Sequence, residues 1–384
     1  MQSTLWRAGL FFALAFPCSF SFPQGFFPDI GAYGALPAEW LVRLVAESLL
    51  GWQAGSYKSL LMSDTSGFYL NAANLLVLSL LASALWQRFA PASDAAAWRE
   101  RFRAVARFYL AWQMLNYGWA KVFKTQFYLP EPNTLYTPLG ELHQDIVFWS
   151  LIGSNDTYNL LGGGLEVAAA LLLFSHRLSR TGALLAAIVM AQIFLFNLAF
   201  NISVKVLSAY LLSLACAILA CDARAFGHFL LPQYIAYTPP APTPQKSYTF
   251  RLFALKISPP LLLIASSLYP FYRASHWHDD QRPRPPLHGA YSVETHIVHA
   301  DTLPPLPTQA QRIQRLAIHR QGYFILQNMQ NQWRSFPLLD VDTLQKTISI
   351  ALPDSSTHVY HYEKISDNTL ILSDLSQRLY LRPL

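Results

Sequence analysis

Charged residues and cysteines are both scarce in this sequence. Of its 384 residues 13% are charged, about half the share expected of a soluble domain. Because 53% are hydrophobic and these gather in long runs, the composition indicates an integral membrane protein. The three cysteines Cys18, Cys216 and Cys221 are too few for a disulfide framework, and no C-x-x-C pair occurs. The arginines cluster in short loops rather than in a basic stripe with aromatics, so no nucleic-acid partner is expected.

Motifs of recognised catalytic and metal sites are also missing. The sequence has no Gly-rich phosphate loop, nucleophile elbow or His-x-x-x-His helix, so no known template supports catalysis by the chain alone. The stretch "HWHDD" (276–280) has ligand spacing but lies in a proline-rich connector. His296 and His299, like His358 and His361, are three residues apart and would point to opposite faces of a strand. We therefore expect no metal site.

Several apolar stretches are long enough to cross a bilayer, which takes about 20 residues. The first is interrupted by Pro17 and Pro23 and is either a membrane anchor or a signal peptide with a weak cleavage site at Ala13-Leu14-Ala15. Its apolar run continues through Phe26 and Phe27, which favours the anchor. The stretches, about seven spans in all, are 5–27, 68–89, 104–125, 158–175, 181–200, 203–220 and 252–272.

The distribution of basic residues between the loops predicts the orientation. Five arginines lie in 88–107, two in "SHRLSR", and three basic residues in 224–251, whereas the loops between them are rich in acids. The basic loops would face the cytoplasm of a bacterial inner-membrane protein. An inside N-terminus and an odd number of spans then place the C-terminus in the periplasm.

The C-terminal region has a different pattern. After a proline-rich linker at 237–245, a last span and a connector, residues 287–384 alternate apolar and polar residues in short stretches such as "YFILQ" and "TLILSDL". This alternation predicts a small soluble antiparallel β domain, a barrel or curved sheet. The expected divisions are 1–103 (first spans and outer loop), 104–222 (transmembrane core), 223–286 (linker, last span and connector) and 287–384 (periplasmic β domain).

Ionisable residues within the spans are the candidate site. Glu166 lies about 12 Å along its helix at 1.5 Å per residue, too deep for its short side chain to reach water. It must be protonated or paired, and either Lys121 or Lys205, both near the outer ends of their spans, is the expected partner. Lys124 is expected to extend to the interface instead.

Polar and aromatic residues near these groups are the predicted binding residues. Gln113, Tyr117 and Lys121 share one helix face at i, i+4 and i+8. Asn159 and Glu166 share another with Gly162 and Gly163, whose small size favours close helix packing. The predicted set is Gln113, Tyr117, Gln126, Trp149, Asn159, Asn197 and Asn201.

Three ordered stretches, "YGWAKVFKTQF", "FWSLIGSNDTYNLLGGGLE" and "FNLAFNISVKVLSAYLL", resemble DoxX-family membrane proteins, in particular longer bacterial members with a C-terminal β domain. The resemblance covers 104–222 well, the β domain loosely and the first two spans hardly at all. It implies an all-α bundle with a four-helix core and an association with membrane redox chemistry. The residues that match its motifs are Gly118, Lys121, Gln126, Phe127, Trp149, Gly153, Asn155, Tyr158, Gly162, Glu166, Asn197, Val204 and Lys205.

Three functional hypotheses follow. The first is an accessory or scaffold component of an envelope redox or assembly system, with a lipid bilayer and a membrane protein as partners and no evident cofactor. The second is a quinone-linked oxidoreductase subunit, in which Glu166 would relay protons to a quinone. The third is a small-molecule or lipid transporter, although no inverted repeat is evident.

Overall fold

The computed structural model describes residues 2–21, 25–53, 63–90, 94–223, 250–274, 277–366 and 369–384. The linker expected at 237–245 and His276 lie outside these residues. The chain forms two compact units. The first consists of Met1–Phe127 and Asn155–Asp279, and the second of Tyr128–Ser154 and Asp280–Leu384.

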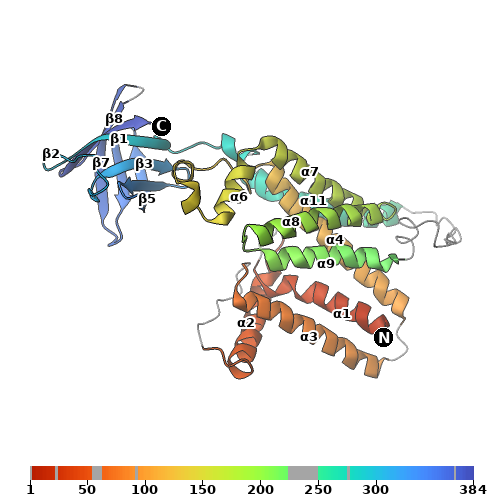
Figure 1. The fold of residues 1–384 in the computed structure, drawn as a ribbon. Helices are drawn as coiled ribbons and strands as arrows, with labels where there is room; N and C mark the ends of the chain where they lie inside the picture. Colours follow the sequence, from red (N-terminus) through yellow and green to blue (C-terminus); the bar gives the residue numbers. More distant parts are fainter. Residues whose placement is uncertain are drawn as a thin grey trace. The chain divides into compact units, whose positions relative to one another are not determined.

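The first unit is helical (Figure 1), and side chains that precede several of its helices cap them. Asp29, Thr65, Asp94 and Asn155 each accept a hydrogen bond from a backbone N–H in the first turn of the helix that follows, which satisfies a donor that the helix leaves unpaired. The elements are α1 (Gln2–Ala15), the 3-10 helix η1 (Pro17–Ser19), α2 (Ile30–Ser48), α3 (Ser66–Phe89), α4 (Ala95–Val122), α7 (Asp156–Phe174), α8 (Ser179–Ala199), α9 (Lys205–Cys221) and α11 (Phe250–Ala274).

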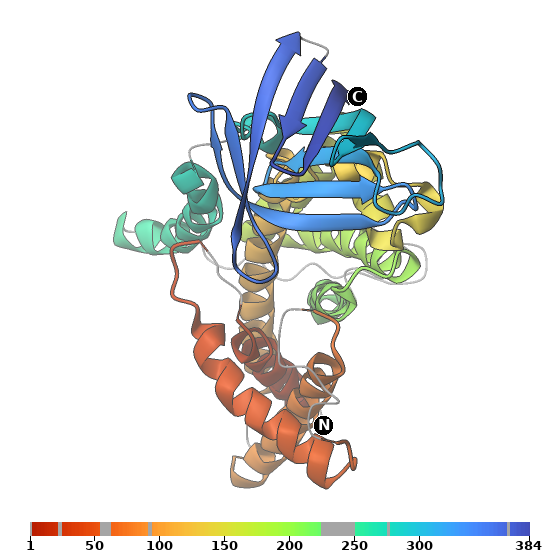
Figure 2. The ribbon, with the colours of Figure 1, turned by 90° about the vertical axis from the view of Figure 1, so that its left-hand side faces the viewer.

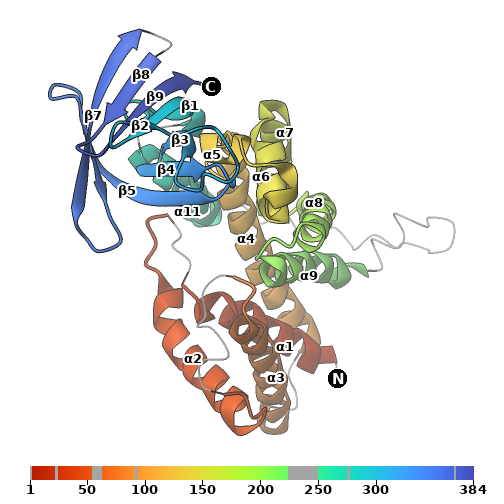
Figure 3. The same cartoon turned by 60° about the vertical axis from the view of Figure 1, so that its left-hand side comes forward.

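Helix α4 is the centre of this unit. It contacts α1, α7, α8, α9 and α11 (Figure 3). Its residues Leu110, Ala111, Met114 and Leu115 are completely buried in one core with residues from α1, α7, α8 and α9. This arrangement places the α4 side chains that were expected to form a site among several other helices.

The prediction of about seven membrane spans is wrong. Among the described residues, three helices are long and apolar enough to cross a membrane: α3, α7 and α8. The expected first span is broken by Pro17 after 14 helical residues, and α9 has 17 residues. Helix α4 contains five charged residues between Arg99 and Arg107, and α11 contains three prolines. The apolar runs in the sequence were therefore longer than the uncharged helices that they form.

The second unit combines short helices from the middle of the chain with the C-terminal strands. Its helices are α5 (Pro132–Leu135), η2 (Leu139–Glu141) and α6 (Gln144–Gly153), and η3 (Asp279–Gln281) precedes the strands. The strands are β1 (Gly289–Val298), β2 (Asp301–Thr302), β3 (Ile313–His319), β4 (Tyr323–Asn328), β5 (Trp333–Asp342), β6 (Thr347–Ala351), β7 (Thr357–Ser366), β8 (Thr369–Ser373) and β9 (Gln377–Pro383).

The strands form a closed antiparallel barrel, so the predicted antiparallel β domain is present. Each strand from β3 to β9 pairs with its neighbour in sequence, β1 pairs with β3, and β1 also pairs with β9, from Tyr291 opposite Pro383 to Val298 opposite Gln377. The two-residue strand β2 pairs with the C-terminal end of β1. In Figure 2 the lighter blue strands run across the darker ones, as expected of a sheet that coils into a small barrel.

Side chains fill the barrel. Alternate residues of β6 and β8 are buried, and the rings of Phe324 and Tyr360 stack with their centroids 5.5 Å apart. Arg312 satisfies backbone groups at an irregularity in β1, where its guanidinium donates to the carbonyl oxygens of Val293 and Glu294 at 3.2 Å each. The interior is thus a packed core of the kind found in small barrels.

Glu131 fastens the segment before α5 to the barrel. Its side chain is buried, and one carboxylate oxygen lies 2.9 Å from Nε of Arg320. The other accepts a hydrogen bond from the Arg320 backbone N–H at 3.1 Å and lies 3.1 Å from Nε2 of His288. Arg320 also stacks on the ring of Tyr128, 3.6 Å from its centroid. This segment therefore folds as part of the barrel unit.

Candidate functional site

Helices α4 and α7 come into direct backbone contact at a pair of glycines. A Cβ on Gly118 would lie 3.0 Å from the carbonyl oxygen of Gly163 and 2.9 Å from a methyl carbon of Val167. Such an approach is possible because neither glycine carries a side chain. The contact brings Lys121, one turn after Gly118, opposite Glu166, one turn after Gly163.

Lys121 and Glu166 form an ion pair at this contact. The ammonium of Lys121 lies 2.8 Å from one carboxylate oxygen of Glu166 and 3.1 Å from the other. The side chain of Glu166 is 1% exposed and that of Lys121 is 12% exposed. A buried charge pair of this kind is stable when both charges are matched and costly when one is removed, so each residue depends on the other.

Aromatic rings surround the ammonium group of Lys121. Its Nζ lies 5.7 Å from the ring centroid of Tyr117 and 5.9 Å from that of Phe127, distances at which a cation is attracted to a ring. Chemically, the arrangement holds an acid and a base in contact within a protein interior, with two rings shielding the cation. It joins two helices and fixes their rotation.

The alternative partner, Lys205, is placed elsewhere. Its ammonium lies 3.4 Å from a carboxylate oxygen of Asp64 and donates to Oδ1 of Asn201 at 3.0 Å. Asp64 also accepts hydrogen bonds from the backbone N–H groups of Lys205, at 2.7 Å, and Val206, at 3.1 Å. The carboxylate therefore caps the start of α9. Sequence reasoning missed Asp64 because it precedes α9 by 141 residues.

Lys124 does not extend to an interface, contrary to the sequence prediction. The residue has a positive φ of 53°, which reverses the chain after α4. Its side chain is 2% exposed and its ammonium bonds to Asp156, whose side chain is 74% exposed. The turn directs the lysine back towards the start of α7 rather than away from the protein.

The other predicted binding residues are divided between the two units, and in the first unit several of them bond to groups of their own or an adjacent helix. Gln113 donates to the Tyr109 hydroxyl at 2.9 Å, and Asn197 donates to Ser208 at 2.9 Å. Asn159 donates to the backbone of Asn155 at 3.0 Å, and Gln126 donates its backbone N–H to Ala120. Trp149 lies on α6 in the second unit. Most of these polar groups serve local helix contacts.

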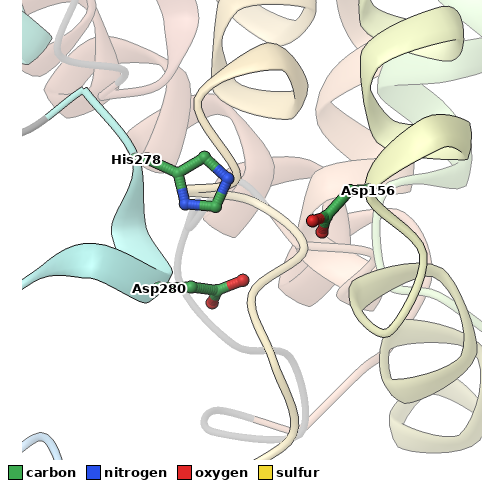
Figure 4. Close-up of side chains that lie close together, drawn as sticks. All are labelled: Asp156, His278 and Asp280. Atoms are coloured by element: carbon green, nitrogen blue, oxygen red, sulfur yellow. The ribbon is translucent and has the colours of Figure 1, made fainter.

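Asp156 and His278 are the members of the first unit that most resemble metal ligands. Their ligand atoms lie within 4.8 Å of each other (Figure 4). The third residue in the figure, Asp280, belongs to the second unit, where its Oδ1 accepts the backbone N–H of Leu129. Asp156 already has a cationic partner in Lys124, which disfavours a divalent metal there.

No model of a known protein family matches the chain, and no solved structure matches it. A curated relative is the uncharacterized protein YwoB of Bacillus subtilis (strain 168), 32% identical over 137 residues, which are 33% of this chain and 81% of the relative. The chain belongs to the YwoB family. Membership in the YwoB family assigns no activity, and about two thirds of the chain lies outside the matched part. The resemblance to DoxX proteins stays a prediction.

Proposed function

We propose that this chain is a multi-pass protein of the bacterial inner membrane that crosses the bilayer with α3, α7 and α8 among its helices. These are the helices of sufficient length and apolarity, and many of their leucines are exposed, as lipid-facing residues would be. Arg88 lies in the last turn of α3, and Arg177 and Arg180 lie at the α7–α8 turn. Basic residues at these ends favour a cytoplasmic location for them.

The barrel would lie on the opposite, periplasmic side. Residues 128–154 fold into one compact unit with the barrel, so both must be on the same side of the membrane. Residue 154 leads directly into α7, at the end far from Arg177 and Arg180. If those arginines are cytoplasmic, the start of α7 and the barrel are periplasmic.

Proteolysis of intact cells from which the outer membrane has been removed tests this orientation. A protease added outside should remove the C-terminal barrel and leave the α7–α8 turn intact. The matched control is an inside-out vesicle, in which the turn should be cleaved and the barrel protected. Protection of the barrel in the intact cells would overturn the proposed orientation.

Within this membrane setting, we infer an accessory or scaffold role, in the DoxX-like manner, for an envelope redox or assembly system. The observation behind it is the Lys121–Glu166 pair: each carboxylate oxygen has the same ammonium as partner, and the glycines beside it bring the two helix backbones into contact. Such an arrangement suits a structural contact that holds two helices together better than it suits a catalytic site. The pair would then keep the helical unit rigid.

A quinone-linked reaction at Glu166 fits these residues poorly. The carboxylate is engaged by Lys121, and a cavity of about 310 Å³ in the same unit is lined by neither Lys121 nor Glu166. We therefore derive no step through a quinone.

Isolation from native membranes in mild detergent tests the scaffold role. We expect a stable protein partner to copurify, and Glu166→Gln to lower the amount of folded protein without changing the ratio of partner to chain. Glu141→Gln, at an exposed position of the second unit, is the control and should change neither. A bound quinone or transported small molecule, with Glu166→Gln abolishing turnover but not folding, would contradict the scaffold role.

A further inference from the structure

A cavity of about 310 Å³ lies in the first unit, among α1, η1, the start of α2, α4 and α11. Ligand pockets span about 300–1,000 Å³, so this one is near the lower end and suits a slender molecule. None of the residues predicted from the sequence as a site lines it. Its walls include Pro17, Cys18, Phe27, Tyr109, Trp112 and Leu263.

The walls are mainly apolar and aromatic, and the polar groups of Asp29 and Tyr109 have partners within the protein. The rings of Phe27 and Trp112 meet edge to face with centroids 5.3 Å apart. The carboxylate of Asp29 accepts the backbone N–H of Ala32 and the hydroxyl of Ser21, and the Tyr109 hydroxyl accepts a hydrogen bond from Gln113. A ligand here would be held by apolar contact rather than by charge.

The wall formed by residues 25–31 is held in place from two sides. Gly25 has a φ of +67°, and a Cβ at this position would overlap the carbonyl oxygen of Ser266 on α11. A Cβ on Gly31 would overlap the carbonyl oxygen of Phe20 beside η1. Because backbone contacts fix this wall, the cavity is formed before any ligand arrives, which lowers the entropic cost of binding.

The rim of the cavity is apolar and exposed. Leu14 is 49% exposed and Ile30 is 63% exposed, and next to Leu263 on α11 the side chains of Leu261 and Leu262 are also exposed. A rim in contact with water would be expected to carry polar residues. The lining helices α1 and α2 pack on α3, and α4 packs on α7. Beside the proposed spans α3 and α7, we expect this opening to face hydrocarbon, where the available ligands are lipid chains.

We propose that this cavity binds one hydrocarbon chain of a membrane phospholipid, which enters past Leu14 and Ile30 and lies against Phe27, Tyr109 and Trp112. The site is too small for a partner helix, which is about 10 Å across, and it offers no free charge for an ionic headgroup. The proposal rests on the membrane location given above, but not on the scaffold role.

Photo-crosslinking tests the proposal. The full-length protein is reconstituted into phosphatidylcholine vesicles that contain a small fraction of phosphatidylcholine with a diazirine at mid-chain, and crosslinked peptides are identified by mass spectrometry. We expect crosslinks to peptides containing Cys18, Phe27 or Trp112 at several times the yield per exposed apolar residue found on α3, most of whose leucines are exposed. Equal or lower yield at the cavity would overturn the proposal.

Two variants that fill the cavity provide a second test of the proposal. Leu263→Phe and Val105→Phe place larger side chains in the cavity lining, on α11 and α4. Each should reduce cavity crosslinks at least fivefold with α3 crosslinks unchanged. Leu261→Phe, on the same helix but outside the cavity lining, is the matched control. An unchanged cavity yield in a variant that retains α3 crosslinking contradicts the proposal, whereas failure of the wild-type protein to enter vesicles contradicts the membrane location instead.

Discussion

The carbonyl oxygen of Gly118 lies 2.5 Å from the position that a Cβ on Gly163 would occupy. This separation is far below an ordinary contact between carbon and oxygen, so α4 and α7 can approach as they do only while residue 163 has no side chain. The ion pair between Lys121 and Glu166 depends on the same approach, because both residues lie one turn beyond the glycines.

Gly163→Ala should therefore destabilise the helical unit. The added methyl group must push a backbone carbonyl away, at a cost of about 1–3 kcal/mol, and should also lengthen the Lys121–Glu166 contact. Unfolding in a denaturing detergent series measures the loss. Gly162→Ala is the control, since nothing lies within 4 Å of its Cβ position, and it should stabilise the helix by about 0.5–1 kcal/mol. Equal effects at the two positions would refute the contact.

Removing one member of the ion pair should lower the stability of the protein more than removing both. Lys121→Met leaves a buried carboxylate without its cation and should cost about 3–5 kcal/mol. The double variant Lys121→Met, Glu166→Leu replaces both charges by apolar groups and should recover most of that loss. A double-mutant cycle on the full-length protein gives the coupling energy, and a coupling near zero would contradict a structural pair.

Asp64 should stabilise α9 from a distant part of the chain. Asp64→Ala removes the acceptor for two backbone N–H groups and the partner of Lys205, and we expect a loss of about 1–2 kcal/mol. Asp64→Asn keeps an oxygen acceptor and should lose less. Hydrogen exchange should rise in the first turn of α9 and remain unchanged in α7. A uniform rise would indicate general unfolding instead of a lost cap.

The pKa of Asp374 predicts how the stability of the barrel changes at low pH. Burial alone would raise the pKa of this carboxyl, but hydrogen bonds from Ser376 and Gln377 outweigh burial and lower the pKa to about 2. The pKa of an unfolded Asp is about 3.9, so the folded state favours the ionised form. The resulting stability, about 1–2 kcal/mol after allowing for solvent, is complete above about pH 4 and is lost as the pH falls through about 2.

Pepsin cleavage of the full-length protein between pH 4 and pH 2 measures this loss. The wild-type barrel should become more susceptible as the pH falls. Asp374→Asn should be less stable at pH 4 and should show a weaker dependence on pH, because it has no carboxylate to protonate. Parallel pH curves for the two proteins would show that Asp374 does not control the acid response.

Local patterns in the sequence predicted local structure, and long-range partners could not be obtained from it. The depth of Glu166 indicated that it needed a partner, but two lysines qualified, and the helix contact at Gly118 distinguishes them. The reversal of the chain at Lys124 could not be inferred from a lysine in an apolar run. Alternation predicted the strands, whereas the pairing of β1 with β9 joins residues about 80 apart, such as Val298 and Gln377.

The attachment of Glu131 to the barrel has a consequence for biogenesis. Glu131 precedes Arg320 by 189 residues, so the loop that contains it is synthesised long before its binding partners exist. Until Arg320 and the strands beside it have been synthesised, this acid remains hydrated and its loop is accessible to proteases and chaperones. Closure of the barrel is then the step that shelters the loop, and chains truncated before β3 would be left with an exposed segment that marks them for degradation.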